Sequence, residues 1–144
     1  MLVLGNGGLA RSLAYAVGQR KGLVSVCGPN DKESRETASK LGCRMVPYQN
    51  LYDTLADVVV IADPRVTAGV KQGQVNASLL KPTQTIVDAA DPPQEHSLYA
   101  EARERGCGKL VGAAKIFGEQ CRAQFKALTG KDLPEGALAA AVVE

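Results

Sequence analysis

A glycine-rich turn near the start of the chain has the composition and spacing of a phosphate-binding loop. Gly5, Gly7 and Ala10 fit the pattern G-x-G-x-x-G/A, after the apolar run Leu2–Leu4 and before a helical pattern. The first glycine permits a tight turn, the second lets the backbone approach a pyrophosphate, and the third small residue lets the helix pack closely on the strand. The helix start then favours the anion.

This turn predicts a dinucleotide site whose cofactor is NAD or NADP. A turn that is rich in glycine only for packing is the alternative. The expected contacts within the turn are Gly5, Asn6, Gly7, Gly8, Leu9 and Ala10.

The residues after the second expected strand should contact the adenosine ribose. An NAD site usually has Asp or Glu there, and an NADP site often has Arg. This chain has Gly28-Pro29-Asn30 instead, followed by Asp31, which we interpret as a helix cap. Lys32 and Arg35 could reach a 2′-phosphate, but a solvated helix face explains them as well. The sequence leaves the choice between NAD and NADP open.

Length and composition indicate a single domain over residues 1–144, with a hydrophobic fraction of 45% that suffices for a core. The net charge of +2 comes from dispersed residues, so we expect neither nucleic-acid nor membrane partners. No signal peptide or membrane span is apparent. The cysteines lack metal-ligand spacing, which predicts buried free thiols, no metal and a reducing, cytoplasmic compartment. They are Cys27, Cys43, Cys107 and Cys121.

Strand-like and helical segments alternate along the chain, which predicts an α/β fold of the Rossmann type: a doubly wound parallel sheet of about six strands in three layers. Strands are expected at residues 2–4, 23–27, 44–46, 58–61, 85–87 and 109–111. Helices are expected at 8–20, 31–41, 97–105 and 114–128, with a helical turn at 51–55 and a loop at 63–84. A strand at the first residue suggests a domain excised from a longer chain.

Particular residues should form the buried faces of these helices or end them. Leu9, Leu13 and Val17 recur every four residues and are expected to form the buried face of the first helix, which Gly22 should end. Glycines 42, 106 and 130 should end the later helices, and Ser97 should cap the third. The inward face of the last helix should contain Ile116, Gln120 or Cys121, Phe125 and Leu128.

Several later segments combine with the glycine turn into a more specific pattern. Asp88, Pro93, Leu98 and Tyr99 keep the spacing of a D-L-V-Y-N-P-x-x-T-P-L-L motif. Residues 101–107, 119–120 and 124–130 match two characteristic helices, and residues 5–11 match GAGGAAR. Together they resemble the C-terminal, NAD(P)-binding half of shikimate dehydrogenases. The ending is most similar to forms fused with 3-dehydroquinate dehydratase.

The resemblance implies an oxidoreductase of aromatic amino acid biosynthesis, in the chorismate pathway. Hydride would pass between the nicotinamide and C3 of 3-dehydroshikimate or shikimate, with NADPH and NADP as the family's cofactor pair. It implies that Gln120 touches the substrate and that Ala62 and Asp63 lie at the cofactor. The family's catalytic lysine and aspartate belong to an N-terminal substrate domain. We therefore expect no catalytic residue within 1–144 and no activity from this fragment alone.

The chain also departs from the family pattern. Gly28-Pro29-Asn30 replaces Asn-Arg-Thr and removes the arginine expected at a 2′-phosphate. Asp63 would place a negative charge near the cofactor, and Asp91 replaces a substrate-side tyrosine. The family's Gly-x-Gly-Met corresponds to residues 112–115 or 113–116.

These departures favour an alternative, a degenerate nucleotide-binding domain with a regulatory or structural role. Another reductase that shares the glycine turn, such as glutamyl-tRNA reductase, is a third possibility, although the helix at residues 120–130 argues against it.

Other ionisable groups offer no complete catalytic set. His96 is the only histidine and is expected at the surface rather than as a base. Asp88 and Asp91 have no further carboxylate motif to support acid–base work. Lys115 is the only base near the start of the last helix. The apolar tail at residues 137–143 is expected to be exposed or to pair with another copy.

Overall fold

The computed structural model describes residues 1–66, 75–90 and 94–138. Within these ranges the strands are β1 (Leu2–Leu4), β2 (Ser25–Cys27), β3 (Arg44–Met45), β4 (Val58–Ile61), β5 (Thr85–Asp88) and β6 (Lys109–Val111). The α-helices are α1 (Gly8–Gln19), α2 (Asp31–Leu41), α3 (Ser97–Glu104) and α4 (Ala113–Thr129). Short 3-10 helices are η1 (Tyr48–Asn50), η2 (Pro64–Val66) and η3 (Ala77–Leu79).

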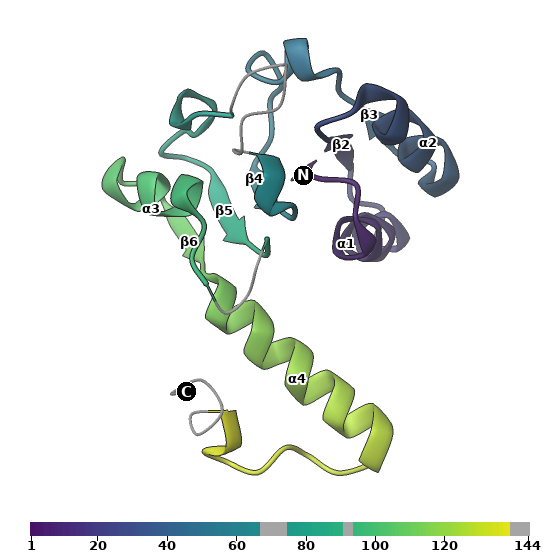
Figure 1. The fold of residues 1–144 in the computed structure, drawn as a ribbon, viewed down its shortest axis with the longest axis vertical. Coiled ribbons are helices and arrows are strands. Elements are labelled where there is room, and N and C mark those ends of the chain that lie inside the picture. Colours follow the sequence, from purple (N-terminus) through teal and green to yellow (C-terminus); the bar gives the residue numbers. More distant parts are fainter. Residues whose placement is uncertain (67–74, 91–93, 139–144) are drawn as a thin grey trace.

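All strand pairs in the described ranges are parallel, and the strands form one six-stranded sheet (Figure 1). Their order is β3-β2-β1-β4-β5-β6. This is the order of doubly wound folds that bind dinucleotides. The predicted fold class is confirmed.

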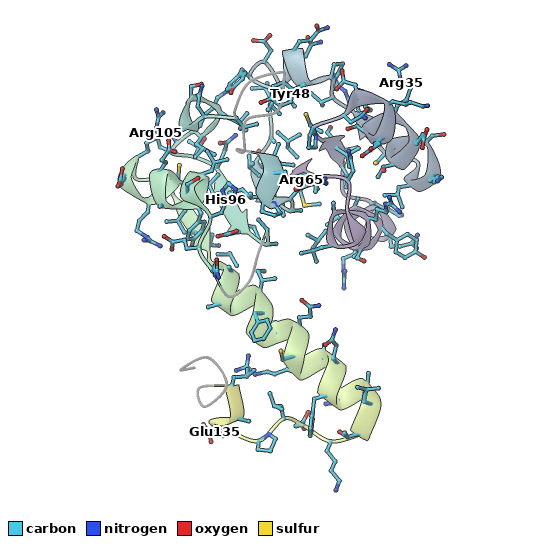
Figure 2. The ribbon with its side chains drawn as sticks, viewed as in Figure 1. Arg35, Tyr48, Arg65, His96, Arg105 and Glu135 are labelled. Atoms are coloured by element: carbon cyan, nitrogen blue, oxygen red, sulfur yellow. The ribbon has the colours of Figure 1, made fainter. Side chains whose placement is uncertain are left out.

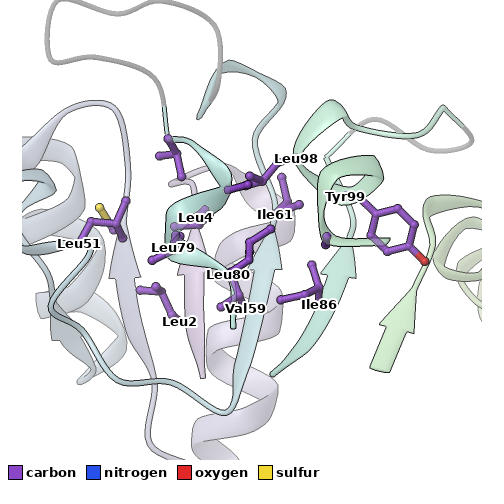
Figure 3. Packing of buried hydrophobic residues seen from close by; sticks show 14 of the residues in the cluster. Leu2, Leu4, Leu51, Val59, Ile61, Leu79, Leu80, Ile86, Leu98 and Tyr99 are labelled. Atoms are coloured by element: carbon purple, nitrogen blue, oxygen red, sulfur yellow. The ribbon is translucent and has the colours of Figure 1, made fainter. Parts of the chain in front are cut away.

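Alternate residues of the central strands enter two hydrophobic cores. Leu2 and Leu4 of β1 join the core shared with α3 and η3, whereas Val3 joins the core shared with α1 and α2. Figure 3 shows the first of these cores, with Leu4 and Ile61 near its centre. A central parallel strand covered on both faces should be apolar throughout, and Val58–Ile61 of β4 meets that expectation.

The buried face of α1 differs from the prediction. Ala10 and Ala14 are the fully buried residues, and the larger Leu9, Leu13 and Val17 are only partly buried around them. The small side chains let the helix axis approach the sheet, so the larger ones lie to either side of the contact. The sequence pattern favours the larger residues because they are more hydrophobic, but it does not indicate how closely the helix approaches the sheet.

The end of α1 also differs from the prediction. Lys21 rather than Gly22 takes the left-handed conformation, with φ of 62°. Gly22 donates its N–H to the Val17 carbonyl at 3.0 Å. A Cβ at position 22 would lie 2.4 Å from Val17 Cγ1. Close packing on Val17, rather than a positive φ, therefore requires this glycine.

The long helix α4 touches the sheet only near its start and then runs away from it (Figure 1). Ala113 and Gly118 are its buried residues, while Leu128 is 86% exposed. The predicted inward face was therefore wrong at Leu128, because no layer of the described chain lies opposite the end of the helix. Ile116 is only partly buried, against the core beside α1.

Some predicted boundaries shift by a few residues. β2 begins at Ser25, which leaves Leu23 outside the strand and 90% exposed. The helical turn expected at residues 51–55 lies earlier, at η1, and β3 ends at Met45. In the described ranges, no helix is long and apolar enough to cross a membrane.

Candidate functional site

A change in strand order places the glycine turn at the natural ligand position of this fold. The chain proceeds outward from β1 to β2 and β3 on one side, and from β4 to β6 on the other. Gly5 donates its N–H to the Cys27 carbonyl at 2.7 Å, and Ala62 donates to the Leu4 carbonyl at 2.9 Å. These bonds bring the carboxyl ends of β2, β1 and β4 together. In open α/β sheets, ligands bind in the crevice at this switch point.

Gly5 brings the turn directly against the loop that follows β4. Its φ is +137°, a conformation that side chains rarely permit. A Cβ at this position would lie 2.8 Å from Asp63 Cβ and 3.2 Å from the Ala62 carbonyl carbon. The first glycine of the motif is therefore required both by backbone conformation and by close packing.

The start of α1 has the features of an anion cradle. Gly7 precedes the helix without any side-chain cap, and the first turn contains no acidic residue. The N–H groups of the first turn lack intrahelical partners, and the helix dipole adds partial positive charge. A Cβ at Gly7 or Gly8 would meet nothing within 4 Å, so the backbone surface is open to a ligand. Leu9 is partly buried and Ala10 is fully buried beneath this surface.

The start of α2 is already satisfied by its own side chains. Asn30 caps the helix, because its Oδ1 accepts from the N–H groups of Lys32 and Glu33 at 2.9 and 3.4 Å. Asp31 does not cap the helix as predicted. It is the first helical residue, and its Oδ1 accepts from the Tyr48 N–H at 3.2 Å. The anion site is therefore expected at α1 and not at α2.

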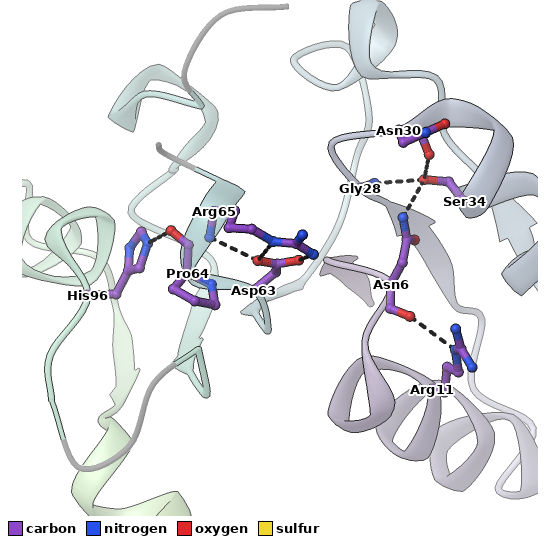
Figure 4. Close-up of polar contacts among 9 residues, drawn as sticks. All are labelled: Asn6, Arg11, Gly28, Asn30, Ser34, Asp63, Pro64, Arg65 and His96. Carbon is purple, nitrogen blue, oxygen red and sulfur yellow. Dashed lines mark hydrogen bonds and ion pairs between the residues drawn. The ribbon is translucent and has the colours of Figure 1, made fainter. Parts of the chain in front are cut away.

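Asn6 connects the glycine turn to the end of β2 (Figure 4). The residue is 5% exposed, and its Nδ2 donates to Ser34 Oγ at 3.1 Å. Ser34 Oγ also accepts from the Gly28 N–H at 3.0 Å and lies 2.9 Å from the Asn30 carbonyl, to which it donates. Arg11 Nε donates to the Asn6 carbonyl at 3.0 Å and braces the turn from α1.

One atom of this network is left without a partner. Asn6 Oδ1 is the buried side-chain polar atom that lacks a hydrogen-bond partner among the described residues. Leaving a buried acceptor unpaired costs about 1–3 kcal/mol. Buried polar atoms without a partner are uncommon, and each calls for an explanation, such as strain, a functional role or a bound water or ion.

Asp63 and Arg65 form an ion pair on the other wall of the crevice (Figure 4). The buried Asp63 carboxylate accepts from Arg65 Nη2 at 2.8 Å, from Nε at 3.0 Å and from the backbone N–H at 2.9 Å. Hydrogen bonding from the Arg65 side chain holds the pKa of Asp63 below its usual value. Asp63 therefore brings a paired charge to this wall, not the isolated negative charge that the sequence suggested. Ala62 is largely buried beside it.

His96 and Asp88 organise the loop after β5. Asp88 is fully buried and accepts from the N–H groups of His96 and Ala90 at 2.7 and 3.3 Å. His96 caps α3, because its Nδ1 accepts from the Leu98 N–H at 3.2 Å. Its Nε2 lies 3.4 Å from the Pro64 carbonyl. The cap predicted at Ser97 is therefore one residue too late.

Most of the remaining candidates that the structure describes are exposed on helices. Gln120 and Lys115 are exposed on α4, which leaves the sheet. Lys32 and Arg35 are exposed on α2, and Arg35 points outward from the molecule (Figure 2). Pro29 is partly buried beside the network of Asn6. Asp91 and Pro93 lie outside the described residues.

The cysteines are considered together with the described acids as possible metal ligands. Among the described residues, no group of three or more metal-ligating side chains is found. All four cysteines are free, with Cys27 and Cys107 buried and Cys43 and Cys121 partly exposed. Burial, with a smaller contribution from the charge of Asp31, raises the pKa of Cys27 to about 12.

Comparison with known proteins finds relatives that match nearly the full chain. No protein-family model matches it. A shikimate dehydrogenase (NADP(+)) from Methanothrix thermoacetophila is 29% identical over 147 residues, which covers 99% of this chain and 53% of the relative. The chain is similar to shikimate dehydrogenases. It spans about half the length of the curated relatives it matches.

Solved structures extend this likeness to the fold. The shikimate dehydrogenase from Aquifex aeolicus superposes with a TM-score of 0.79 at 24% identity, over 99% of this chain and 53% of that one. The quinate dehydrogenase from Corynebacterium glutamicum in complex with NAD also gives 0.79, at 20% identity and with coverage of 99% and 54%. The Rossmann-type fold of the chain is therefore shared with about half of each of these two dehydrogenases.

Proposed function

We propose that residues 1–144 bind a nicotinamide dinucleotide as the cofactor domain of a shikimate dehydrogenase-type oxidoreductase. The observation that carries this proposal is the uncapped start of α1, which faces the crevice between β1 and β4. A pyrophosphate would accept from the N–H groups of the first helical turn, close to Gly7 and Gly8. The unpaired Asn6 Oδ1 and the open space over both glycines fit a bound cofactor.

The proposed division of work follows from the positions of the side chains. When bound, the cofactor would supply or accept a hydride, with 3-dehydroshikimate or shikimate as the reacting partner. Residues 1–144 would hold and orient it, and the groups that move the proton would lie in a substrate domain outside this segment. Gln120 is exposed on α4 and could face that domain. Asp88 is not proposed for the proton role, because its carboxylate is fully buried and holds the loop after β5 through two backbone N–H groups.

The proposal is tested by binding experiments on the 144-residue chain. Calorimetric titration with NAD, NADP and ADP-ribose should show saturable binding of all three. Gly7→Ala should weaken binding by about tenfold or more, because its methyl group would enter the space of the pyrophosphate. Gly18→Ala is the matched control, since it lies at the other end of α1, where a Cβ also meets nothing within 4 Å.

The two variants separate binding from folding. Gly18→Ala should keep or raise the unfolding midpoint, because alanine is favoured over glycine inside helices. Gly7→Ala should lower the midpoint only slightly, because Gly7 is the N-cap of α1, where glycine is favoured over alanine. A wild-type chain that binds none of the three nucleotides would overturn the proposal. Equal binding by the wild type and Gly7→Ala would remove the glycine turn from the site.

A further inference from the structure

The amide of Asn6 occupies the position where a ribose-binding acid would begin. β2 ends at Cys27, so Gly28 stands where NAD sites usually have Asp or Glu. A Cβ at Gly28 would lie 2.1 Å from Asn6 Nδ2 and 2.8 Å from Oδ1. No side chain can start at position 28 while Asn6 is in place. A side-chain acceptor at this point of the crevice must therefore come from Asn6, out of the glycine turn.

The network around Ser34 decides which amide atom is left for a ligand. The Ser34 hydroxyl has one proton, which it donates to the Asn30 carbonyl at 2.9 Å. It can therefore only accept from its two other neighbours, the Gly28 N–H and Asn6. This orients Nδ2 toward Ser34 and leaves Oδ1, an acceptor, without a partner.

The charges around this position favour a hydroxyl over a phosphate. Asp31 and Glu33 lie in the first turn of α2, with Lys32 between them. Arg65, across the crevice, is bound to Asp63. Arg35 points outward (Figure 2). An amide oxygen accepts a hydrogen bond from a ribose hydroxyl, whereas a 2′-phosphate would place further negative oxygens against it.

We propose that Asn6 Oδ1 accepts a hydrogen bond from the 2′-hydroxyl of the adenosine ribose, so that the domain prefers NAD to NADP. This inference rests on the proposed dinucleotide site. Asn6 takes the role of the acid that usually follows β2 in NAD sites. It is a neutral acceptor, and it comes from the turn after β1. Oδ1 is buried in this structure, so this hydrogen bond requires the Asn6 side chain to turn toward the ribose.

The test compares ligands that differ only at the ribose 2′ position. The wild-type chain should bind NAD about tenfold more tightly than either NADP or 2′-deoxy-NAD. Asn6→Ala should lose about tenfold in affinity for NAD and should bind 2′-deoxy-NAD as the wild type does. In NMR spectra, the Asn6 side-chain amide should shift on addition of NAD and much less on addition of 2′-deoxy-NAD.

Ser34→Ala tests the orientation of the Asn6 amide. It removes the acceptor that holds Nδ2 while it keeps Asn6, so it should bring the affinities for NAD and 2′-deoxy-NAD closer together, whereas an equal loss for both ligands would indicate a merely structural role of the network. If Asn6→Ala fails to fold, the comparison of ligands on the wild-type chain still decides. Equal binding of NAD and 2′-deoxy-NAD by the wild type would overturn this inference and leave the dinucleotide site standing, whereas no binding of any dinucleotide would overturn both.

Discussion

Asp63 is bound by Arg65 through both the guanidinium and the backbone N–H, directly beside the turn at Gly5. The pair joins a buried carboxylate to an exposed side chain on the wall of the crevice. Its geometry fixes the residues that follow β4 at the point where Gly5 approaches them most closely. The family resemblance places the negative charge of Asp63 near a cofactor. In the structure this charge is paired with Arg65 within the loop after β4.

The ion pair predicts a pH-dependent loss of stability in acid. The pKa of Asp63 is lower in the folded chain than in the unfolded chain, chiefly because of hydrogen bonding from Arg65. The pair therefore stabilises the fold above the unfolded pKa of about 3.9, and this contribution disappears as the pH falls through the folded pKa. Arg65→Gln should lower the thermal midpoint at neutral pH, and the difference from the wild type should narrow below about pH 4.

Thermal unfolding across the acid range measures this difference. Arg35→Gln, an exposed arginine on α2, should match the wild type at every pH. A deficit for Arg65→Gln that stayed constant through the titration of Asp63 would contradict the assigned role of the pair.

Gly5 and Gly7 are predicted to differ sharply in their tolerance of alanine. Gly5→Ala should destabilise the chain by more than about 2 kcal/mol, because it combines a positive φ with a Cβ contact of 2.8 Å to Asp63. Gly7→Ala should cost about 1 kcal/mol or less, since its φ of −70° suits alanine and its Cβ meets no atom, so that only the N-cap preference for glycine is lost. Urea unfolding gives both values, and similar costs for the two would contradict the geometry of the turn.

His96 is predicted to stabilise the chain as the cap of α3. His96→Ala should cost about 1 kcal/mol in unfolding free energy because it removes the acceptor of the Leu98 N–H. His96→Asn should recover most of this loss, since asparagine is among the best N-cap residues. Ser97→Ala, at the position that the sequence favoured, should change stability by less than about 0.5 kcal/mol. The backbone bond from His96 to Asp88 is kept in all three variants.

The sequence predicted the sheet well because its information is local and strongly periodic. β1, β4 and β6 have the predicted bounds, and Gly42 ends α2 with a φ of 63° as expected. The caps were missed because Asn30 and Asp31, or His96 and Ser97, are neighbouring polar residues with similar preferences. Their choice depends on the direction in which the chain leaves the preceding strand.

The candidate site was predicted in part for a related reason. The glycine motif specifies the turn, so Gly5 and Gly7 could be identified from spacing alone. The buried Asn6 network depends on Ser34, which is 28 residues away and belongs to another element. No spacing rule connects the two. The one available signal was the glycine at position 28, which indicates a close approach without naming the residue that approaches.

The 144-residue chain is predicted to bind its cofactor without catalysing hydride transfer. Transfer to a carbonyl needs a positioned proton donor and a pocket that holds the substrate. Gln120 and Lys115 are exposed on a helix that leaves the sheet, and Asp88 is fully buried. We expect no shikimate-dependent reduction of NAD or NADP by absorbance assay, even at high protein concentration.

A chimera in which this chain replaces the matching half of the Methanothrix thermoacetophila relative should show turnover, with the unaltered relative as positive control. A folded chimera that binds NAD but stays silent would favour a non-catalytic, regulatory domain, and turnover by the isolated chain would point to Lys115 as the first residue to substitute.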